Sequence, residues 1–353
     1  MSVIKNLLEK PARWLTDDGE ENEMVLSCRV RLARNLDKRP FTHTAQPKFL
    51  SEIRDEIRSA LAGTDSMKGA IYVDMDDTPE SDRMVLAERR LISYELVKNF
   101  KSRALVVEPG EKMSVMVNEE DHLRLQSVEP GLSMQHAYER VDRLDDELDG
   151  RLNFAFSEKV GYLTACTTNV GTGLRVSAMV HLPGLVHKKD IQQIIDGLRH
   201  VRLTVRGTYG EGSDFMGNFF QISNTITLGL SEVDTVKNLE AHVRKVLEFE
   251  KKARNVLLDK ARSLLEDKIW RAYGILKTAR LLTTKEAMGL ISAVRLGVGL
   301  GIITDVKLPD LNEMLIMIQP MHLQRLYSRS MAPEERDRAR ADYMRAKLGA
   351  GDA

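Results

Sequence analysis

Residues that could take part in chemistry gather in a few short stretches of this chain. Cys166 ends an apolar run that begins at Gly161, and a turn rich in Thr, Asn and Gly separates it from Arg175. The apolar runs on either side of the turn predict two strands, the second ending at Pro183. The turn lacks the Gly-Lys-Ser/Thr of a phosphate-binding P-loop and the third glycine of a dinucleotide fingerprint. The stretch therefore predicts either a strand-end site with a thiol and a guanidinium, or a plain hairpin with a core cysteine and a surface arginine.

Two more arginines lie in a strand-like stretch, Met24–Leu36. Apolar and polar residues alternate there, which places Arg29 and Arg31 on one face of a strand and Cys28 on the other. Two arginines on one strand face are costly unless they are solvated or paired with anions. The stretch therefore predicts either a wet sheet face or an anion site.

Acidic residues accompany two further predicted strands. Glu120 lies in the run Asn-Glu-Glu-Asp-His, where an apolar strand breaks before it resumes at Arg124. Glu211 lies in a glycine-bearing loop that follows Arg206. The run around Glu120 predicts either a polar site or a solvated loop. We expect His122, beside three acids, to be a structural hydrogen-bond partner rather than a catalytic group.

Together these groups suit phosphoryl transfer from ATP to a guanidine. Arginine binds phosphate oxygens through its fork of donors, and several of them could neutralise a triphosphate. Two glutamates can hold a planar guanidinium by its edges, and one can accept the proton as nitrogen attacks phosphorus. A thiolate, favoured by nearby arginines, would add a third anionic contact. The five arginines are Arg29, Arg31, Arg124, Arg175 and Arg206.

The composition indicates which partners and which cellular compartment to expect. The chain has 353 residues and a formal net charge of zero, so no overall basic field indicates nucleic acid or a membrane surface as a partner. Its two cysteines make no disulfide framework, which favours a reducing cytoplasm. No apolar stretch reaches membrane-spanning length, and no signal peptide is visible at the start. We expect a cytoplasmic protein.

The predicted elements change in character along the chain. Up to residue 231 strands and helices mix, whereas residues 232–353 are almost wholly helical. We therefore expect two domains, 1–231 and 232–353. Helices are predicted at 1–15, 47–62, 79–98, 132–150 and 187–200, and strands at 70–75, 104–107, 112–128, 202–206 and 219–230.

Four motifs resemble those of the phosphagen (guanidino) kinase family. They are SCRVRLARNL, VNEEDHLRL, GYLTACTTNVGTGLRVS and RGTYGEG, and their order and spacing cover about residues 24–230. The resemblance implies an α+β fold, an antiparallel sheet flanked by helices like the catalytic part of glutamine synthetase, which periodicity alone does not show. It also implies a kinase that uses ATP and Mg²⁺, with no metal ion held by the protein itself.

The resemblance also implies residue roles. Glu120 and Glu211 resemble the pair that clamps the substrate, with Glu120 as the base, and Cys166 resembles the reactive cysteine of the family. The implied nucleotide contacts are Ser27, Arg29, Arg31, Arg90, Arg124, Arg175, Val176, Ser177, Arg206 and Gly207. Met179 and Arg90 stand where relatives have histidine, so the sequence does not define the adenine contacts.

The domain order resembles one bacterial branch of the family, whose members phosphorylate arginine side chains in proteins. Only 26 residues precede Ser27, where metabolite-type members carry a helical domain with a substrate lid, and the extra helical domain here follows the catalytic one. The branch has an Arg-Asp-x-x-Arg-Ala motif, matched here by Arg336, Asp337, Arg340 and Ala341. Two of these, Asp337 and Arg340, share a helix face and predict an allosteric site for phosphoarginine. A solvated C-terminal helix is the alternative.

The same branch implies partners. These are protein substrates with accessible arginines, including stress-response repressors, a zinc-binding activator protein, and a Clp-type unfoldase and protease. The apolar surface of the helical domain predicts a homodimer. Two other functions stay open: a kinase for free arginine or another small guanidine, which the missing lid disfavours, and an adaptor without catalysis, which the full set of glutamates and arginines disfavours.

Overall fold

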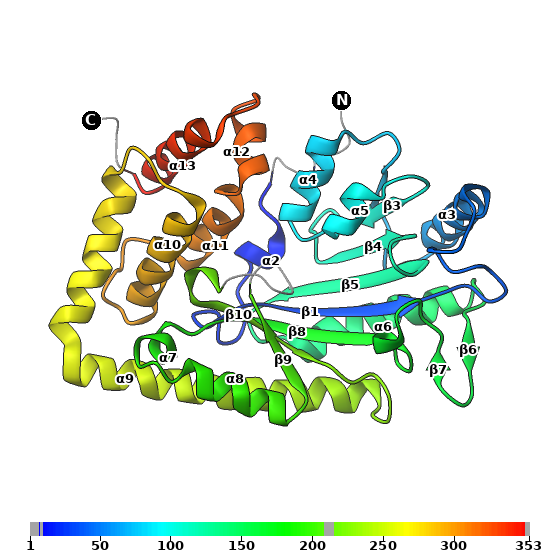
Figure 1. The fold of residues 1–353 in the computed structure, drawn as a ribbon, viewed down its shortest axis with the longest axis horizontal. Coiled ribbons are helices and arrows are strands. Elements are labelled where there is room, and N and C mark those ends of the chain that lie inside the picture. The colour runs from blue at the N-terminus through cyan, green and yellow to red at the C-terminus, as the bar shows by residue number, and fades with distance from the viewer. Residues whose placement is uncertain (1–6, 8–9, 208–214, 350–353) are drawn as a thin grey trace.

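The structure, a computed structural model, describes residue 7 and residues 10–207 and 215–349. These form one large antiparallel sheet with helices on both sides and a helical region at the C-terminal end (Figure 1), which confirms the α+β fold. The eight strands follow the spatial order β2-β3-β4-β5-β1-β8-β10-β9. They are β1 (Val25–Arg34), β2 (Ile71–Asp74), β3 (Ala104–Val107), β4 (Met113–Val117), β5 (Leu123–Pro130), β8 (Leu174–His181), β9 (Leu203–Arg206) and β10 (Phe219–Asn224).

One face of the sheet is buried under helices. Cys28, Val30 and Leu32 of β1 point to this face and join the main hydrophobic core with apolar residues of neighbouring strands. Their alternation with arginines is the period-two pattern of a strand with one buried face. The covering helices are α3 (Pro47–Ala62), α6 (Met134–Asp149), α8 (Ile191–His200) and the first half of α9 (Glu232–Thr278).

The opposite face is covered only at its ends, which leaves its centre for polar side chains. Toward β2 and β3, the short helices α4 (Glu80–Glu88) and α5 (Tyr94–Lys98) pack in a separate small core. At the other end a third core joins the short helix α2 (Arg13–Thr16) and sheet residues to the C-terminal helices. Those helices are α10 (Thr284–Gly299), α11 (Leu308–Met317), α12 (Pro320–Leu326) and α13 (Pro333–Lys347).

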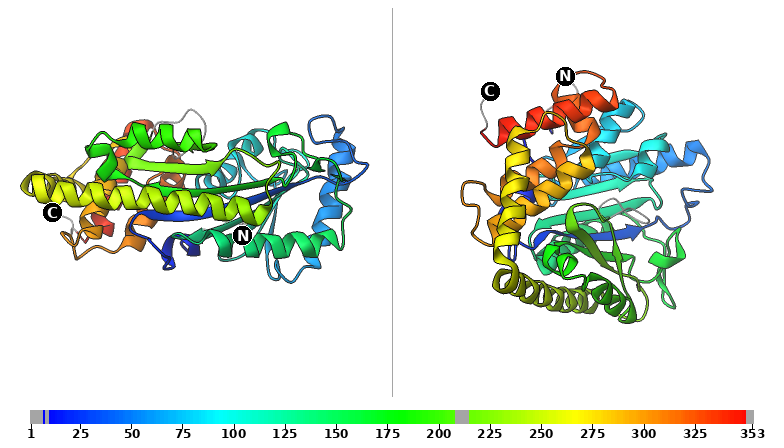
Figure 2. Two further views of the ribbon diagram at one scale, coloured as in Figure 1. Left: turned by 90° about the horizontal axis from the view of Figure 1, so that it is seen from below. Right: turned by 60° about the vertical axis from the view of Figure 1, so that its left-hand side comes forward.

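Helix α9 connects the two parts of the chain. Its first half runs beneath the sheet, and Figure 2 shows the second half turning away toward the C-terminal helices. The turn is at Ala261, whose backbone leaves helical geometry at φ −144° and ψ 31°. Val236 and Val243 lie in the main core, whereas Leu265 and Ile269 lie in the core of the C-terminal helices. The packing thus favours a domain boundary close to Ala261 rather than at residue 232, and we propose that position.

Two predicted helices are interrupted by a residue with a left-handed backbone. The helix expected over 79–98 breaks between α4 and α5 at Arg90, which has a φ of 64°. The helix expected over 187–200 begins only at Ile191, as α8, because Lys189, which also has a φ of 64°, separates it from α7 (Pro183–His187). A left-handed residue ends a right-handed helix, and here tertiary contacts override helical periodicity.

Two predicted strands are shorter than expected. Of the apolar run that ends at Cys166, only β7 (Gly161–Tyr162) is a strand, and it pairs with β6 (Phe156–Ser157) outside the main sheet. The rest of that run bonds to loops, since the Ala165 amide donates to the Asp121 carboxylate. The strand expected over 219–230 ends at Asn224, whose side-chain amide takes over backbone partners on β8.

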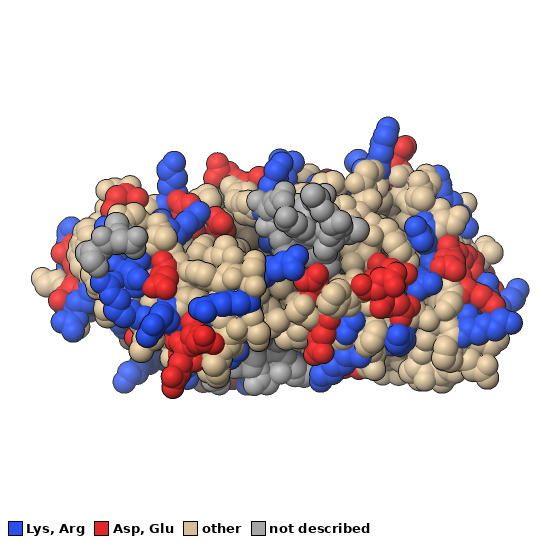
Figure 3. Space-filling view, turned by 90° about the horizontal axis from the view of Figure 1, so that it is seen from above, with Lys and Arg blue, Asp and Glu red and all other residues tan. Residues whose placement is uncertain are grey.

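The remaining expectations about elements agree with the structure within a few residues at each end, apart from the N-terminal helix, most of which falls on residues outside the described ranges. Positive and negative side chains intermix over the face seen in Figure 3, in keeping with the zero net charge. Within the described ranges, no helix is both long and apolar enough to span a membrane.

Candidate active site

Strand register brings the predicted phosphate-binding residues onto the polar face of the sheet. Arg31 of β1 lies directly opposite Arg175 of β8, and Arg29 lies opposite Ser177. Residues that face each other across antiparallel strands point to the same side of the sheet. These four side chains therefore share the face that the main core does not use.

The flanking strands extend the same face. Ala33 of β1 lies opposite Arg124 of β5, so Arg124 joins the group. Gln221 of β10 pairs with Met179 of β8 on one side and with Arg206 of β9 on the other. All five arginines expected from the sequence therefore gather on one face, contributed by four different strands.

This gathering of cations is electrostatically unfavourable without an anion. Burial, together with the nearby Arg90 and Arg124, lowers the pKa of Arg29 to about 10. Burial lowers the pKa of Arg31 well below its usual value, with further repulsion from Arg29, Arg124 and Arg175. The Arg31 Nε is buried and has no hydrogen-bond partner among the described residues. A polyanion bound here would offset the repulsion and supply the missing acceptor.

A cavity of about 290 Å³ opens on this face. Its wall includes Arg29, Arg31, Arg124 and Arg206 together with Gln126 and Gln221 from the sheet. On the side of α4 and α5 the wall is Ala87, Glu88, Arg90, Ile92, Ser93, Tyr94 and Met116. The volume and the cationic floor suit the phosphates of a nucleotide.

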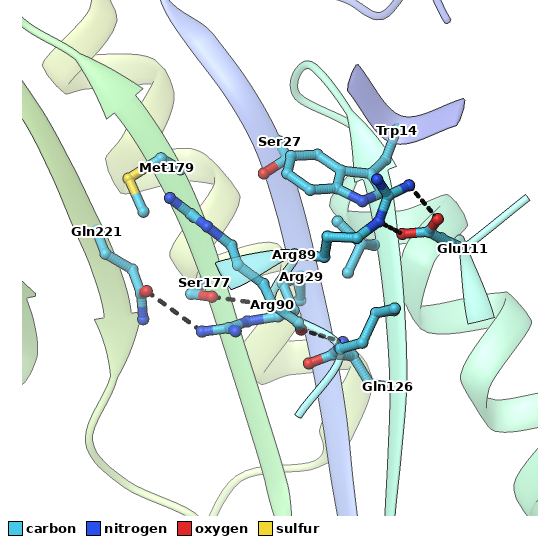
Figure 4. A pocket seen from close by; sticks show the side chains of 12 residues that line it. Trp14, Ser27, Arg29, Arg89, Arg90, Glu111, Gln126, Ser177, Met179 and Gln221 are labelled. Carbon is cyan, nitrogen blue, oxygen red and sulfur yellow. Dashed lines mark hydrogen bonds and ion pairs between the residues drawn. The ribbon is translucent and has the colours of Figure 1, made fainter. Parts of the chain in front are cut away.

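A smaller recess continues from the cavity toward α2 (Figure 4). Trp14, Ser27, Ser177 and Met179 are among the residues that line it. In Figure 4 the Arg90 side chain extends across the recess toward Met179, so the two residues that depart from the family pattern lie together. We propose that this recess receives the adenine end of the nucleotide.

Two glutamates pair with one arginine at the end of β5. Arg124 Nη1 lies 2.7 Å from Glu119 Oε2, and Arg124 Nη2 lies 2.5 Å from Glu120 Oε2. Glu119 is buried and also accepts a 2.6 Å bond from the Ser93 hydroxyl. Burial raises the pKa of Glu119, but Arg124 and these hydrogen bonds outweigh it and hold that pKa below its usual value. The Glu120 side chain, by contrast, is 41% exposed and so can reach a substrate.

A buried carboxylate ties this acidic turn to the cysteine loop. Asp121 Oδ1 accepts bonds from the Asn35 side-chain amide at 2.6 Å and from the Ala165 backbone amide at 2.7 Å. Ala165 immediately precedes Cys166, a half-buried residue whose Sγ lies 3.0 Å from the Thr168 hydroxyl. The predicted base and the predicted thiol therefore lie on two loops that one aspartate holds together.

His122 and Cys28 are structural, as expected. His122 Nδ1 accepts the Leu36 amide at 3.0 Å and Nε2 lies 3.0 Å from the Pro40 carbonyl, so both ring nitrogens are occupied. Burial lowers the pKa of His122, which keeps the imidazole neutral. Cys28 is fully buried, and burial raises its pKa to about 12.

Of the remaining residues predicted to contact the nucleotide, some line the recess and others do not. Ser27 and Ser177 line the recess, but the Val176 side chain lies in the main core on the opposite face and its amide donates to Asn224. Gly207 is buried at the end of β9, and Glu211 lies outside the described residues.

The C-terminal motif is split between surface and interior. Arg340 is only 1% exposed and donates to the carbonyls of Ile318 and Leu282 as well as to Asp337, whose carboxylate lies 2.6 Å away. Ala341 is fully buried. Arg336 is partly exposed. Asp337 and Arg340 share a helix face, as predicted, and form an ion pair there, but a buried arginine with backbone partners also has a structural role.

Sequence reasoning missed three residues of the site. Ser93 caps α5 and binds Glu119, Gln221 accepts a 3.2 Å bond from Arg29, and Asp121 joins the two loops. Serine is a preferred helix cap, but the helix predicted over 79–98 runs through Ser93, so its capping role was not visible. Gln221 and Asp121 act through long-range contacts that no local pattern reveals.

An antiparallel sheet that presents arginines to a cavity, with a glutamate and a cysteine on adjoining loops, fits the family that the sequence motifs resemble. Residues 52–253 match the family described as "ATP:guanido phosphotransferase, C-terminal catalytic domain", and the chain belongs to this family. Residues 262–353 match a second family, described as "Protein-arginine kinase McsB C-terminal domain".

Relatives of similar length carry the name protein-arginine kinase. One from Halothermothrix orenii is 42% identical over 98% of this chain and 99% of its own. Another from Symbiobacterium thermophilum is 44% identical over 96% of this chain and 97% of its own.

Among solved structures the fold is similar to that of a lombricine kinase, with a TM-score of 0.59 at 24% identity over 70% of this chain and 75% of that one. It is also similar to the duplicated taurocyamine kinase from Schistosoma mansoni with bound transition-state analogue components. That match has a TM-score of 0.56 at 25% identity and covers 67% of this chain and 33% of that one.

Proposed function

We propose that this chain is a protein-arginine kinase, which transfers the γ-phosphate of ATP to arginine side chains of proteins. The observation that carries the proposal is the similarity along the whole chain, both domains included, to proteins of that name. The cationic sheet face supports the ATP half of the reaction, and the exposed Glu120 beside it supports the guanidine half.

In the proposed reaction the arginines position the phosphates and Glu120 handles the proton. Arg31 and Arg175, opposite each other at the centre of the face, bind oxygens of the transferred group and neutralise charge that develops on it. Glu120 holds one edge of the substrate guanidinium and accepts a proton as its nitrogen attacks phosphorus. The N–P bond forms as the bond from phosphorus to the β–γ bridging oxygen breaks, and ADP leaves. We propose Glu211 for the other edge and Cys166 for a third contact.

We propose that magnesium enters this site as part of the nucleotide complex. Among the described residues, no group of three or more His, Cys, Asp or Glu could hold a metal ion. Mg²⁺ keeps several waters and is commonly bound through substrate phosphates, so the arginine face would hold it by way of the nucleotide. When bound, it would neutralise charge on the β- and γ-phosphates.

We also propose that Arg336, Asp337, Arg340 and Ala341 form a binding site for phosphoarginine on α13. Asp337 and the partly exposed Arg336 offer a carboxylate for a guanidinium and a guanidinium for a phosphate, while Arg340 and Ala341 form the buried base. Occupancy by phosphorylated protein would make the kinase responsive to its own product. A cytoplasmic homodimer that acts with a zinc-binding activator and a Clp-type unfoldase, and that phosphorylates stress-response repressors, belongs to the same proposal.

The competing function is phosphorylation of free arginine or another small guanidine. Incubation with ATP, Mg²⁺ and either an unstructured arginine-containing protein or free arginine separates the two. Acid-labile phosphate on arginine, mapped by mass spectrometry in the protein, with little turnover of the free amino acid, is expected. Efficient turnover of free arginine with no phosphate on protein would favour the small-guanidine kinase.

A further inference from the structure

One wall of the nucleotide cavity contacts the C-terminal helical domain directly. Glu88, the last residue of α4, lines the cavity and is 5% exposed. Its carboxylate accepts the backbone amides of Met321 at 2.9 Å and His322 at 3.0 Å, both in the first turn of α12. The same carboxylate lies 2.7 Å from His322 Nδ1. A single side chain of the catalytic domain thus receives three hydrogen bonds from one helix of the other domain.

The imidazole in this contact is neutral and fixed. Burial lowers the pKa of His322, so the ring carries one proton. Its Nε2 is buried without a hydrogen-bond partner among the described residues, whereas Nδ1 faces the Glu88 carboxylate. The proton therefore lies on Nδ1 and is donated to Glu88, since a proton on Nε2 would be unsatisfied.

The two residues after Glu88 connect its contact with α12 to the cavity wall. Arg89 forms a buried ion pair with Glu111, in which Arg89 Nε lies 2.9 Å from Oε2. Arg90 adopts a left-handed backbone with φ 64°, and its carbonyl accepts a 3.1 Å bond from the Gln126 side chain. A non-glycine residue holds such a backbone only where its surroundings fix it. Glu88 and Arg89 supply that fixation on one side of Arg90, and Gln126 supplies it on the other.

The start of α12 is in turn held by α13. Arg340 Nε donates to the Ile318 carbonyl at 2.9 Å, and Ile318 lies just before Pro320, the first residue of α12. An unbroken series of contacts therefore leads from α13 through α12 to Glu88 and on to Arg90.

We propose that Glu88 is a positioning residue for nucleotide binding: by anchoring the end of α4 to α12, it fixes the Arg90 backbone and so the direction in which the Arg90 side chain enters the nucleotide cavity. The proposal rests on the proposed function in taking the cavity as the ATP site. It assigns the C-terminal domain a part in nucleotide binding although, within the described ranges, none of the residues that line the cavity comes from that domain.

The test compares Glu88→Gln with Glu80→Gln, an exposed acid at the start of the same helix. A glutamine side chain accepts through one oxygen only and turns an N–H₂ group toward donors, so at least one of the three hydrogen bonds from α12 is lost. ADP affinity, measured by calorimetry on the full chain, is expected to fall about tenfold in Glu88→Gln, the scale of a lost hydrogen bond to a charged group, and to be unchanged in Glu80→Gln. The KM for ATP should rise by the same factor, with kcat at saturating ATP changed less.

Two more variants separate positioning from general damage. His322→Ala removes the ring contact from the other domain and should weaken ADP binding in the same direction, by less. In an Arg90→Ala background, Glu88→Gln should weaken ADP binding no further, because Glu88 acts by directing the Arg90 side chain, which alanine lacks. A merely structural glutamate would lower the unfolding midpoint without this non-additivity.

ADP affinity equal to that of Glu80→Gln in both Glu88→Gln and His322→Ala would overturn the proposal, and so would additive effects in the double variant. ADP binding needs no phosphate acceptor. If Glu88→Gln leaves ADP affinity unchanged while the wild-type chain phosphorylates protein, this proposal alone is refuted. If Glu88→Gln weakens ADP binding but the wild-type chain does not phosphorylate protein, only the proposed function is refuted.

Discussion

Asp121 offers a sharp test of how the site is assembled, because the chain permits two substitutions with different expected costs. Asp121 is fully buried, and its Oδ1 accepts one hydrogen bond from the Asn35 side chain and one from the Ala165 amide. Asp121→Ala leaves both donors without an acceptor. Asp121→Asn keeps an oxygen at the same place and changes only the second atom, Oδ2, which has no hydrogen-bond partner among the described residues.

The magnitudes follow from these contacts. A hydrogen bond to a charged group contributes about 1.5–3 kcal/mol, and two are lost, so Asp121→Ala should lower the free energy of unfolding by roughly 3–6 kcal/mol. Asp121→Asn should cost about 1–2 kcal/mol, because both bonds persist to a neutral acceptor. Burial raises the pKa of Asp121, so the neutral side chain also avoids the penalty of a buried charge.

Denaturant unfolding at neutral pH measures both values against wild type. The same variants are assayed for phosphorylation of an arginine-containing protein, since the Ala165 amide precedes Cys166. Asp121→Ala is expected to lose most activity, and Asp121→Asn is expected to retain much more. Equal stability losses in the two variants would show that the hydrogen bonds to Oδ1 do not hold the loops together.

Other consequences can be checked separately. Cys166 is half-buried, whereas Cys28 is fully buried and has a pKa raised to about 12, so alkylating reagents should label Cys166 much faster. ATP and substrate should protect Cys166, and equal labelling of the two cysteines would mean that Cys166 is merely structural. Asp337→Ala should reduce the stimulation of the kinase by added phosphoarginine, a coupling of about 1–3 kcal/mol, and undiminished stimulation would place the effector site elsewhere. Burial lowers the pKa of His122, so below about pH 6.5 the unfolded chain takes up a proton that the folded chain excludes, and the free energy of unfolding falls with pH. Between pH 7.5 and 5, His122→Gln should therefore lose less of this free energy than wild type, by up to about 2 kcal/mol in denaturant unfolding.

Local patterns were sufficient to predict one part of the cationic face, the arginines of β1. The alternation that puts Arg29 and Arg31 opposite Cys28 follows from strand geometry and from the burial of one face. That Arg175 and Arg206 share this face depends on register between strands distant in sequence, and the resemblance to a family supplied what periodicity could not.

Contacts between separate loops or domains were beyond local reasoning. The helix expected over 79–98 breaks because Arg90 turns left-handed where tertiary contacts hold it. The apolar run before Cys166 has the composition of a strand, yet its backbone bonds to Asp121. The sequence did not indicate that Glu88 contacts the C-terminal helices, since its partners on α12 lie more than two hundred residues away.

In the proposed mechanism, the arginine face binds the nucleotide while Glu120 acts on the guanidine. Single-turnover phosphorylation of an unstructured arginine-containing protein by Glu120→Gln, with ADP affinity measured in the same preparation, tests both halves at once. A fall in rate of about 100-fold or more with ADP affinity close to that of wild type is the predicted result, on the scale of a lost general base. A near-normal rate would remove Glu120 from the mechanism, and a parallel loss of ADP affinity would contradict the separation of the two roles.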